Sequence, residues 1–220
     1  MDFMIVPVRR GFFQISPIFD ICKEFDAVIC GGYVRYMASP RLRPIKAKDV
    51  DIFSKDVESY NQLLKKLIDM GSTIIHENNI SVTMKLNGYP TLQLIKPVEE
   101  GAIVAVGEME DILNNFDFTV VRCGLISSTE IMADIDFLKD EKKCILHIKN
   151  IHCPISSMLR CMKYSRKGYC IKPMEVLKLF ADWDNRNDEY KERLYDFFER
   201  SGDHLSRKEI DELEALLWID

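Results

Sequence analysis

The sequence lacks the features of a membrane or secreted protein. No apolar run approaches the roughly 18 to 20 residues needed to cross a bilayer, and the chain begins without the basic and apolar segments of a secretory signal. Its seven cysteines are odd in number, and no two of them have the C-x-x-C spacing. We therefore expect a cytoplasmic protein with reduced thiols, and neither a disulfide framework nor a structural zinc site.

A basic excess is also missing. The chain has 30 Lys and Arg against 35 Asp and Glu, which gives a formal net charge of -5. Any contact with nucleic acid must therefore come from a local basic patch. What is present is an ordinary globular composition over 220 residues, 47% of them hydrophobic, which excludes a disordered or fibrous chain.

The pattern of apolar residues changes near residue 150. Before it, short β-branched and aromatic runs alternate with stretches whose apolar residues recur every three or four positions. The runs predict strands at Ala27–Cys30, Asp49–Phe53, Thr73–His76, Ser81–Leu86, Thr91–Ile95 and Phe118–Cys123. The other stretches predict helices at Ile18–Phe25, Gly32–Ala38, Val57–Met70 and Glu108–Phe116.

After residue 150 the pattern is helical throughout. It predicts helices at Ile155–Lys167, Pro173–Trp183, Glu189–Glu199 and Arg207–Trp218. We therefore predict an α+β fold with two parts, a mixed domain over residues 1–150 and a small helical unit over residues 151–220.

The segment Ala27–Phe53 carries the strongest chemical signal. Gly31 and Gly32 lie between a strand and a helix, where the backbone can approach a bound anion such as a triphosphate. Asp49 and Asp51 are two apart in the next strand, so both carboxylates face one side. Two like charges side by side favour a neutralising cation, and Mg²⁺ is the ion that takes carboxylate and phosphate oxygens.

These residues resemble a known family. Gly31 to Arg35 and Lys48 to Ile52 are similar to the signature of the polymerase β-type nucleotidyltransferase superfamily, most of all to its CCA-adding (tRNA nucleotidyltransferase) and bacterial poly(A) polymerase branch. Two looser matches follow, at Asn115 to Arg122 and in the helix segment Leu159 to Tyr164. The likeness covers about residues 25 to 170, the head and neck of that branch.

The resemblance implies a polymerase β-like head of mixed sheet and helices, followed by a helical neck and body. It implies Asp49 and Asp51 as metal ligands for two Mg²⁺ ions, with Asp117 as the further catalytic candidate, either as a third carboxylate or on the ribose side. Gln93 stands where relatives place a Glu, and so it shares the candidacy for the third ligand. The expected nucleotide contacts are Gly31, Gly32, Arg35, Arg122, Arg160 and Lys163.

The implied activity is Mg²⁺-dependent transfer of a nucleoside monophosphate from ATP or CTP to an acceptor hydroxyl. The first acceptor to expect is an RNA 3′ end of the tRNA type, which implies an RNA partner and no membrane. Two alternatives stay open: transfer to a hydroxyl of a protein or small molecule, and a non-catalytic module that binds nucleotide or RNA. The sequence leaves the oligomeric state open.

Overall fold

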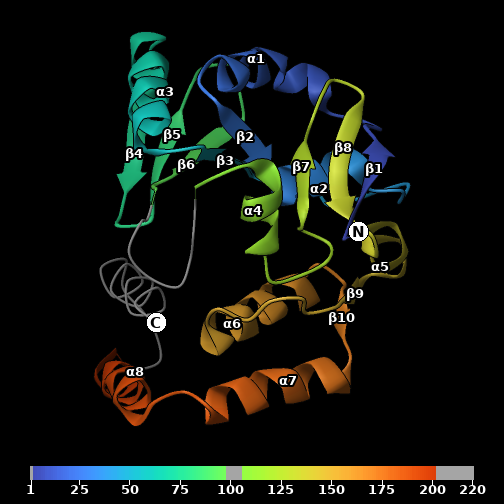
Figure 1. Cartoon of the computed structure of the whole chain (residues 1–220), viewed down its shortest axis with the longest axis vertical. Helices are drawn as coiled ribbons and strands as arrows, with labels where there is room; N and C mark the ends of the chain where they lie inside the picture. Colours follow the sequence, from blue (N-terminus) through green and yellow to red (C-terminus); the bar gives the residue numbers. More distant parts are fainter. Residues whose placement is uncertain (1, 98–105, 202–220) are drawn as a thin grey trace.

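The architecture is an eight-stranded mixed sheet covered by helices, followed by a helical unit. The computed structural model describes residues 2–97 and 106–201, and the predicted helix Arg207–Trp218 lies outside this part. Within the described residues no helix is both long and apolar enough to span a bilayer. Figure 1 shows the sheet above and the helices α6, α7 and α8 below it.

The sheet has the spatial order β1-β8-β7-β2-β3-β6-β5-β4, and only its β3–β6 pair is parallel. A separate parallel ribbon, β9–β10, joins the end of the head to the helical unit. The strands of the large sheet are β1 Phe3–Pro7, β2 Ala27–Cys30, β3 Asp49–Ser54, β4 Thr73–Glu77, β5 Ser81–Lys85, β6 Thr91–Ile95, β7 Cys123–Leu125 and β8 Glu130–Asp134. The ribbon comprises β9 Ile145–Leu146 and β10 Cys170–Ile171.

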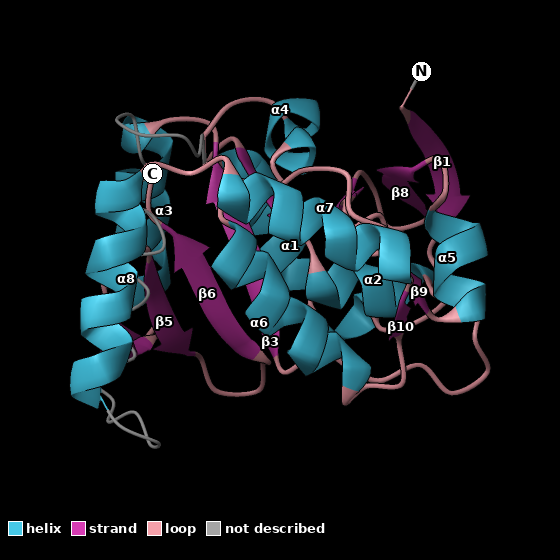
Figure 2. Cartoon of the chain, turned by 90° about the horizontal axis from the view of Figure 1, so that it is seen from below, coloured by secondary structure: helices cyan, strands magenta, loops and turns pink. Residues whose placement is uncertain are grey.

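The helices divide between the two faces of the sheet and the unit below it. The helices of the head are η1 Phe12–Gln14, α1 Ser16–Glu24, α2 Gly32–Ala38, α3 Val57–Asp69, α4 Met109–Asn114 and α5 Phe137–Lys143. The helical unit consists of α6 Pro154–Ser165, α7 Pro173–Asp184 and α8 Asp188–Ser201. In both views α6 and α7 lie beside each other (Figures 1 and 2).

Alternation along the central strands builds a core on each face of the sheet. On one face Ile29 and Val50 pack with Ile18 of α1 and Leu63 of α3. The opposite face, which carries Val28, Cys30 and Phe53, is covered by α4 through Ile112 and Leu113. The α4 face is the one directed toward α6 in Figure 1, so a residue on it can reach the helical unit.

Most of the predicted elements are confirmed within one or two residues of their bounds, and the α+β fold is confirmed. The strand predicted at Phe118–Cys123 is wrong, since the strand runs over Cys123–Leu125 instead. Phe118 begins a tight turn, in which its carbonyl accepts from the N–H groups of Val121 and Arg122. Phe118 and Val120 are fully buried there, so their apolar character reflects burial in a turn and not a strand. The pattern also missed β1, β8 and α5.

The helical unit shares a core with the head. Phe118 and Leu146 pack with Tyr164 of α6 and Leu179 of α7. Tyr169, which directly precedes β10, belongs to the same cluster. Side chains from both sides of residue 150 therefore form one hydrophobic cluster, which fixes α6 against the head.

Candidate active site

The two aspartates of β3 lie on one face of the sheet, as the spacing predicts. Val50 and Ile52 are almost fully buried in the core beneath α1, while Asp49 and Asp51 are partly buried on the opposite face. In the parallel β3–β6 pair, Asp51 is opposite Gln93 and Asp49 is opposite Thr91. The register thus places an amide beside Asp51, at the position in question for a third ligand.

A tight turn at Gly31 brings the start of α2 against Asp51. Gly31 has φ 80° and ψ −138°. A Cβ at this position would lie 3.1 Å from Asp51 Oδ2 and 3.2 Å from Cε1 of Phe116, so both conformation and space require glycine. At Gly32 a Cβ would meet only Ala47, at an ordinary 3.8 Å.

The N–H groups of this glycine pair face groups of the protein itself. Gly31 donates to the carbonyl of Cys123 at 2.8 Å, and the Gly32 N–H lies close enough to the Asp51 carboxylate to oppose the rise in the pKa of Asp51. The pair therefore positions Asp51 against α2, and the phosphate contacts expected of Gly31 and Gly32 stay a prediction.

The environment of Asp51 favours a cation. Burial and, secondly, the charge of Asp49 raise the pKa of Asp51 from its ordinary value of 3.8 to about 7. Lys163, Arg160 and the Gly32 N–H oppose this rise in pKa without cancelling it. A divalent ion would relieve the repulsion between the two carboxylates, so this donor pair fits Mg²⁺. Within residues 2–97 and 106–201 no group of three or more His, Cys, Asp and Glu side chains could hold a metal.

Asp117 lies at the α6 side of this site. It is 4% exposed. Its Oδ2 accepts from Arg160 Nη1 at 3.2 Å and from Ser157 Oγ at 3.3 Å. The other oxygen, Oδ1, is buried without a hydrogen-bond partner among the described residues. Asp117 is thus held by α6, whereas Gln93 occupies the strand position next to Asp51.

One face of α6 supplies the cations that the sequence predicts. Arg160 and Lys163 lie close enough to lower the pKa of Asp51, and Asp117 raises the pKa of Arg160. In the turn after this helix, burial and then Lys163 lower the pKa of Lys167, while Asp49 opposes that change. The fold therefore brings Asp49, Asp51, Asp117, Arg160 and Lys163 into one site.

Arg35 is engaged elsewhere. It is 1% exposed. Its guanidinium donates to Tyr169 Oη at 2.9 Å, to Glu141 Oε1 at 3.3 Å and to the Ile45 carbonyl at 2.8 Å. Burial disfavours the charge, but Tyr169 and Glu141 outweigh it and raise the pKa of Arg35. The geometry gives Arg35 a structural role between α2, α5 and the helical unit in place of the expected nucleotide contact.

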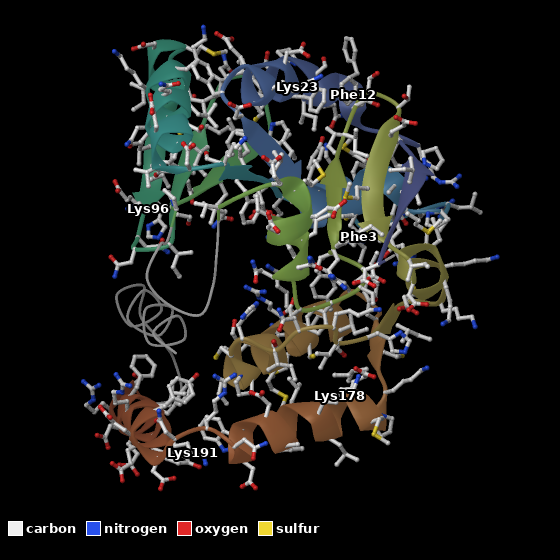
Figure 3. All side chains as sticks on the ribbon, in the orientation of Figure 1. Phe3, Phe12, Lys23, Lys96, Lys178 and Lys191 are labelled. Carbon is white, nitrogen blue, oxygen red and sulfur yellow. The ribbon has the colours of Figure 1, made fainter. Side chains whose placement is uncertain are left out.

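Arg122 is a second arginine with its donors in use. It donates to Asp134 Oδ2 at 2.6 Å, to Asn114 Oδ1 at 2.6 Å and to the Leu113 carbonyl at 3.0 Å. Its guanidinium also stacks 5.0 Å from the ring centroid of Phe3, which Figure 3 labels. Arg122 therefore ties α4 to the sheet, and we leave it out of the proposed nucleotide contacts. The sequence match at Asn115 to Arg122 did not indicate that Arg122 has this structural role.

The fold is that of the CCA-adding enzymes. The Bacillus stearothermophilus CCA-adding enzyme in complex with CTP matches with a TM-score of 0.57 at 18% identity, over 78% of this chain and 43% of that chain. A tRNA-processing enzyme in an apo form matches with a TM-score of 0.55 at 18% identity, over 81% and 49% of the two chains. A tRNA nucleotidyltransferase complexed with a primer tRNA and an incoming ATP analogue matches with a TM-score of 0.51 at 19% identity, over 73% and 47%.

The sequence family is a different one. The model of the Gabija anti-defense 2 family matches residues 9–143, which is more than half of the chain, and the chain belongs to this family. "Gabija anti-defense 2" of Bacillus phage SPbetaL7 is 25% identical over 196 residues, which cover 86% of this chain and 46% of that protein. The chain thus spans about half the length of the curated relative it matches.

Proposed function

We propose that this protein is a Mg²⁺-dependent nucleotidyltransferase. In the proposed reaction an acceptor hydroxyl loses its proton to solvent and its oxygen bonds to the α-phosphorus of an NTP. The bond between that phosphorus and the leaving oxygen breaks, and pyrophosphate departs. The observation that carries the proposal is the juxtaposition of Asp49 and Asp51 with the cationic face of α6. The two carboxylates would bind the metal, and the cations on the other side of the same site would bind the triphosphate.

Asp49 and Asp51 would hold the metal, with the amide oxygen of Gln93 as a weaker neighbouring donor. Bound Mg²⁺ supplies charge neutralisation for the phosphates and the reacting oxygens. Gln93 donates from Nε2 to Ser81 Oγ at 3.0 Å, so the amide oxygen is the atom left for a ligand. Among the chain's own groups, Arg160 and Lys163 would orient the triphosphate.

We assign Asp117 to the ribose side of the nucleotide. Its Oδ2 is held by Arg160 and Ser157, and its Oδ1 is buried without a partner in the described part of the chain. A buried carboxylate oxygen without a donor is costly, and a ribose hydroxyl would satisfy it. The same contact would fix the nucleotide beside the metal ligands.

The family suggests the setting in which the transfer acts. Because the chain belongs to the Gabija anti-defense 2 family, we propose that the transfer serves to counter a bacterial defence system and not to mature tRNA. The acceptor is then an RNA 3′ end or a hydroxyl of a defence component. Both are compatible with the site, since each presents a hydroxyl to the α-phosphorus.

A second candidate is a nucleotide-binding protein without turnover. Gln93 favours it, because a neutral amide beside Asp51 binds Mg²⁺ more weakly than a carboxylate would. Such a protein would sequester nucleotide or RNA and transfer nothing.

Label transfer from each of the four α-labelled NTPs separates these functions. The purified chain is incubated with Mg²⁺ and, in parallel, with RNA, single-stranded DNA or protein extract of a bacterial host. We expect label on one acceptor class, and we expect Asp49→Asn with Asp51→Asn to remove it. Asp69→Asn, an exposed carboxylate at the end of α3, is the matched control. NTP binding without label on any acceptor would favour the non-catalytic candidate.

A further inference from the structure

A large open groove lies at the start of β3, the strand that carries Asp49 and Asp51. Three segments line it: the turn from η1 into α1, residues 46–48 before β3, and residues 87–90 before β6. Its volume is about 860 Å³, and ligand pockets in proteins range from roughly 300 to 1,000 Å³. The groove is thus large enough for more than the single nucleotide that the carboxylate site needs.

The lining of this groove is cationic and aromatic. It contains Lys46 and Lys48 and no acidic side chain, although the whole chain has a net charge of -5. Lys46 Nζ donates to the neutral Gln14 Oε1 at 2.8 Å. Within the part of the chain that the structure describes, neither lysine forms an ion pair. Both charges are therefore available to an anionic ligand.

Phe13 supplies an exposed ring beside these lysines. It is 91% exposed, and it lies in the groove lining with the partly buried Tyr89. Free aromatic faces next to unpaired cations are the combination that binds single-stranded nucleic acid, since bases stack on the rings while phosphates meet the cations. A duplex cannot stack in this way, because its base faces are covered by neighbouring base pairs.

The groove ends at the start of β3, the strand that carries the carboxylate pair. Lys48 directly precedes Asp49, and the register that pairs Asp49 with Thr91 places Lys48 next to Pro90, another lining residue. One end of the groove is therefore a single residue from Asp49 along β3. The groove is lined by the start of α1, whereas Asp49 and Asp51 lie on the opposite face of the sheet. A single strand in the groove would therefore pass around the start of β3 to bring its terminus to the metal ligands.

We propose that this groove binds the terminal nucleotides of a single-stranded nucleic-acid acceptor. Phe13 stacks on a base, and Lys46 and Lys48 bind backbone phosphates, so that the 3′-hydroxyl is held at Asp49 and Asp51. This inference rests on the proposed function and specifies its acceptor. It favours a nucleic-acid terminus over a protein hydroxyl, because an unpaired cationic groove with an exposed ring matches a polyanion that carries bases.

Fluorescence anisotropy with a labelled single-stranded RNA of about ten nucleotides tests the groove without any transfer reaction. We expect Lys46→Glu with Lys48→Glu to weaken binding and to reduce the slope of log K against log salt by about 1.4, which is two contacts at roughly 0.7 each. We expect Phe13→Ala to weaken binding by about 5- to 150-fold, the cost of one base stack. The same RNA annealed into a duplex should bind more weakly than the single strand.

Matched variants outside the groove control for the change in charge and for the loss of an aromatic ring. Lys65→Glu with Lys142→Glu changes two exposed lysines of α3 and α5, and Phe180→Ala removes an exposed ring of α7. We expect both to bind the RNA as the wild type does. Three results would each overturn the proposal. The groove variants could bind the RNA as tightly as the control variants do, or the duplex could bind as tightly as the single strand. Polyglutamate could also displace the labelled RNA as well as unlabelled RNA does.

The outcome separates this inference from the proposed function. If the wild type labels a protein and does not bind the RNA, the groove assignment is wrong and nucleotidyl transfer stands. If the RNA binds in the groove and no acceptor is labelled, the groove assignment stands and the proposed transfer is wrong.

Discussion

Asp51 of β3 and Gln93 of β6 are register partners in the only parallel pair of the large sheet. Their side chains therefore lie on the same face, one strand apart, with Gln93 anchored to Ser81. In the proposed site the amide lies where a third carboxylate would complete the metal ligands. We therefore expect Gln93 to limit how tightly the proposed site binds Mg²⁺.

Gln93→Glu should tighten Mg²⁺ binding, because a third carboxylate adds a charged oxygen ligand beside Asp51. We expect an increase of about tenfold or more in affinity, since a favourable charge contact contributes about 1.4 kcal/mol or more. Isothermal titration with MgCl₂ measures this directly, and Gln93→Leu should bind no better than the wild type. Weaker binding by the Glu variant would remove position 93 from the proposed ligand set.

Gly31→Ala should destabilise the protein and disrupt the site. A residue with a Cβ is strained at φ 80°, and the added atom would contact Asp51 and Phe116. We expect a loss of about 1 to 3 kcal/mol in the free energy of unfolding. Gly32→Ala, whose Cβ meets only Ala47 at 3.8 Å, should change the free energy by about 0.5 kcal/mol or less. Urea denaturation of both variants measures the contrast, and equal losses would contradict it.

Asp51→Asn should stabilise the metal-free protein at high pH. The pKa of Asp51 is raised to about 7 in the fold, so folding favours the protonated acid. Stability is lost as pH rises from about 4, where the unfolded carboxyl ionises, through the folded pKa near 7, and it is constant above that. Asn carries no charge and avoids this loss, which we put at about 1 to 3 kcal/mol above pH 8.

The measurement is urea unfolding in EDTA at pH 4 and at pH 8. The difference between Asp51→Asn and the wild type should be near zero at pH 4 and largest at pH 8. A difference that is independent of pH would show that charge repulsion in the pair is not its cause.

Arg35→Lys should reduce stability without altering the nucleotide site. Lysine cannot reproduce the three contacts of the guanidinium with Tyr169, Glu141 and the Ile45 carbonyl, and Glu141 would be left partly unpaired in the core. We expect a loss of about 1 to 3 kcal/mol in the free energy of unfolding, because lysine keeps the charge but loses hydrogen bonds of the guanidinium. Nucleotide affinity, measured by titration under conditions where the variant is still folded, should stay within about twofold of the wild type. A large loss of affinity with normal stability would return Arg35 to the nucleotide contacts.

Asp117→Asn should weaken the preference for ribonucleotides. If Oδ1 accepts a ribose hydroxyl, the wild type binds ATP more tightly than 2′-deoxy-ATP or 3′-deoxy-ATP, by about 5- to 10-fold for one hydrogen bond. The Asn variant should bind ATP and at least one of these analogues about equally. Competition titrations compare the three nucleotides, and unchanged discrimination would separate Asp117 from the ribose.

Local patterns in the sequence predicted most of the elements. The strand Ala27–Cys30 and the helix Gly32–Ala38 have the predicted bounds, because period-two burial and the glycine turn are local properties. The edge strand β1 and its neighbour β8 were missed. β1 contains the exposed Ile5 and ends at a proline, so its alternation is weak, and it exists through pairing with a strand more than 120 residues away.

The spacing of Asp49 and Asp51 predicted their common face, whereas the sequence did not predict the contacts of Arg35 and Arg122. Asp49 and Asp51 share a face because alternation along a strand is fixed by backbone geometry. Two of the three candidate arginines, Arg35 and Arg122, did not follow from their motifs. Arg35 and Arg122 look like phosphate contacts in the sequence, but each found buried acceptors from distant segments.

The sequence by itself determined that two carboxylates follow a glycine turn on adjacent elements, because dihedral preferences and strand alternation act over a few residues. Only the tertiary structure decided which cations face that pair, that Gln93 lies beside Asp51, and that a cationic groove begins at Lys48. Those relationships depend on strand order and on how α6 packs against the head, and burial and long-range contacts set both.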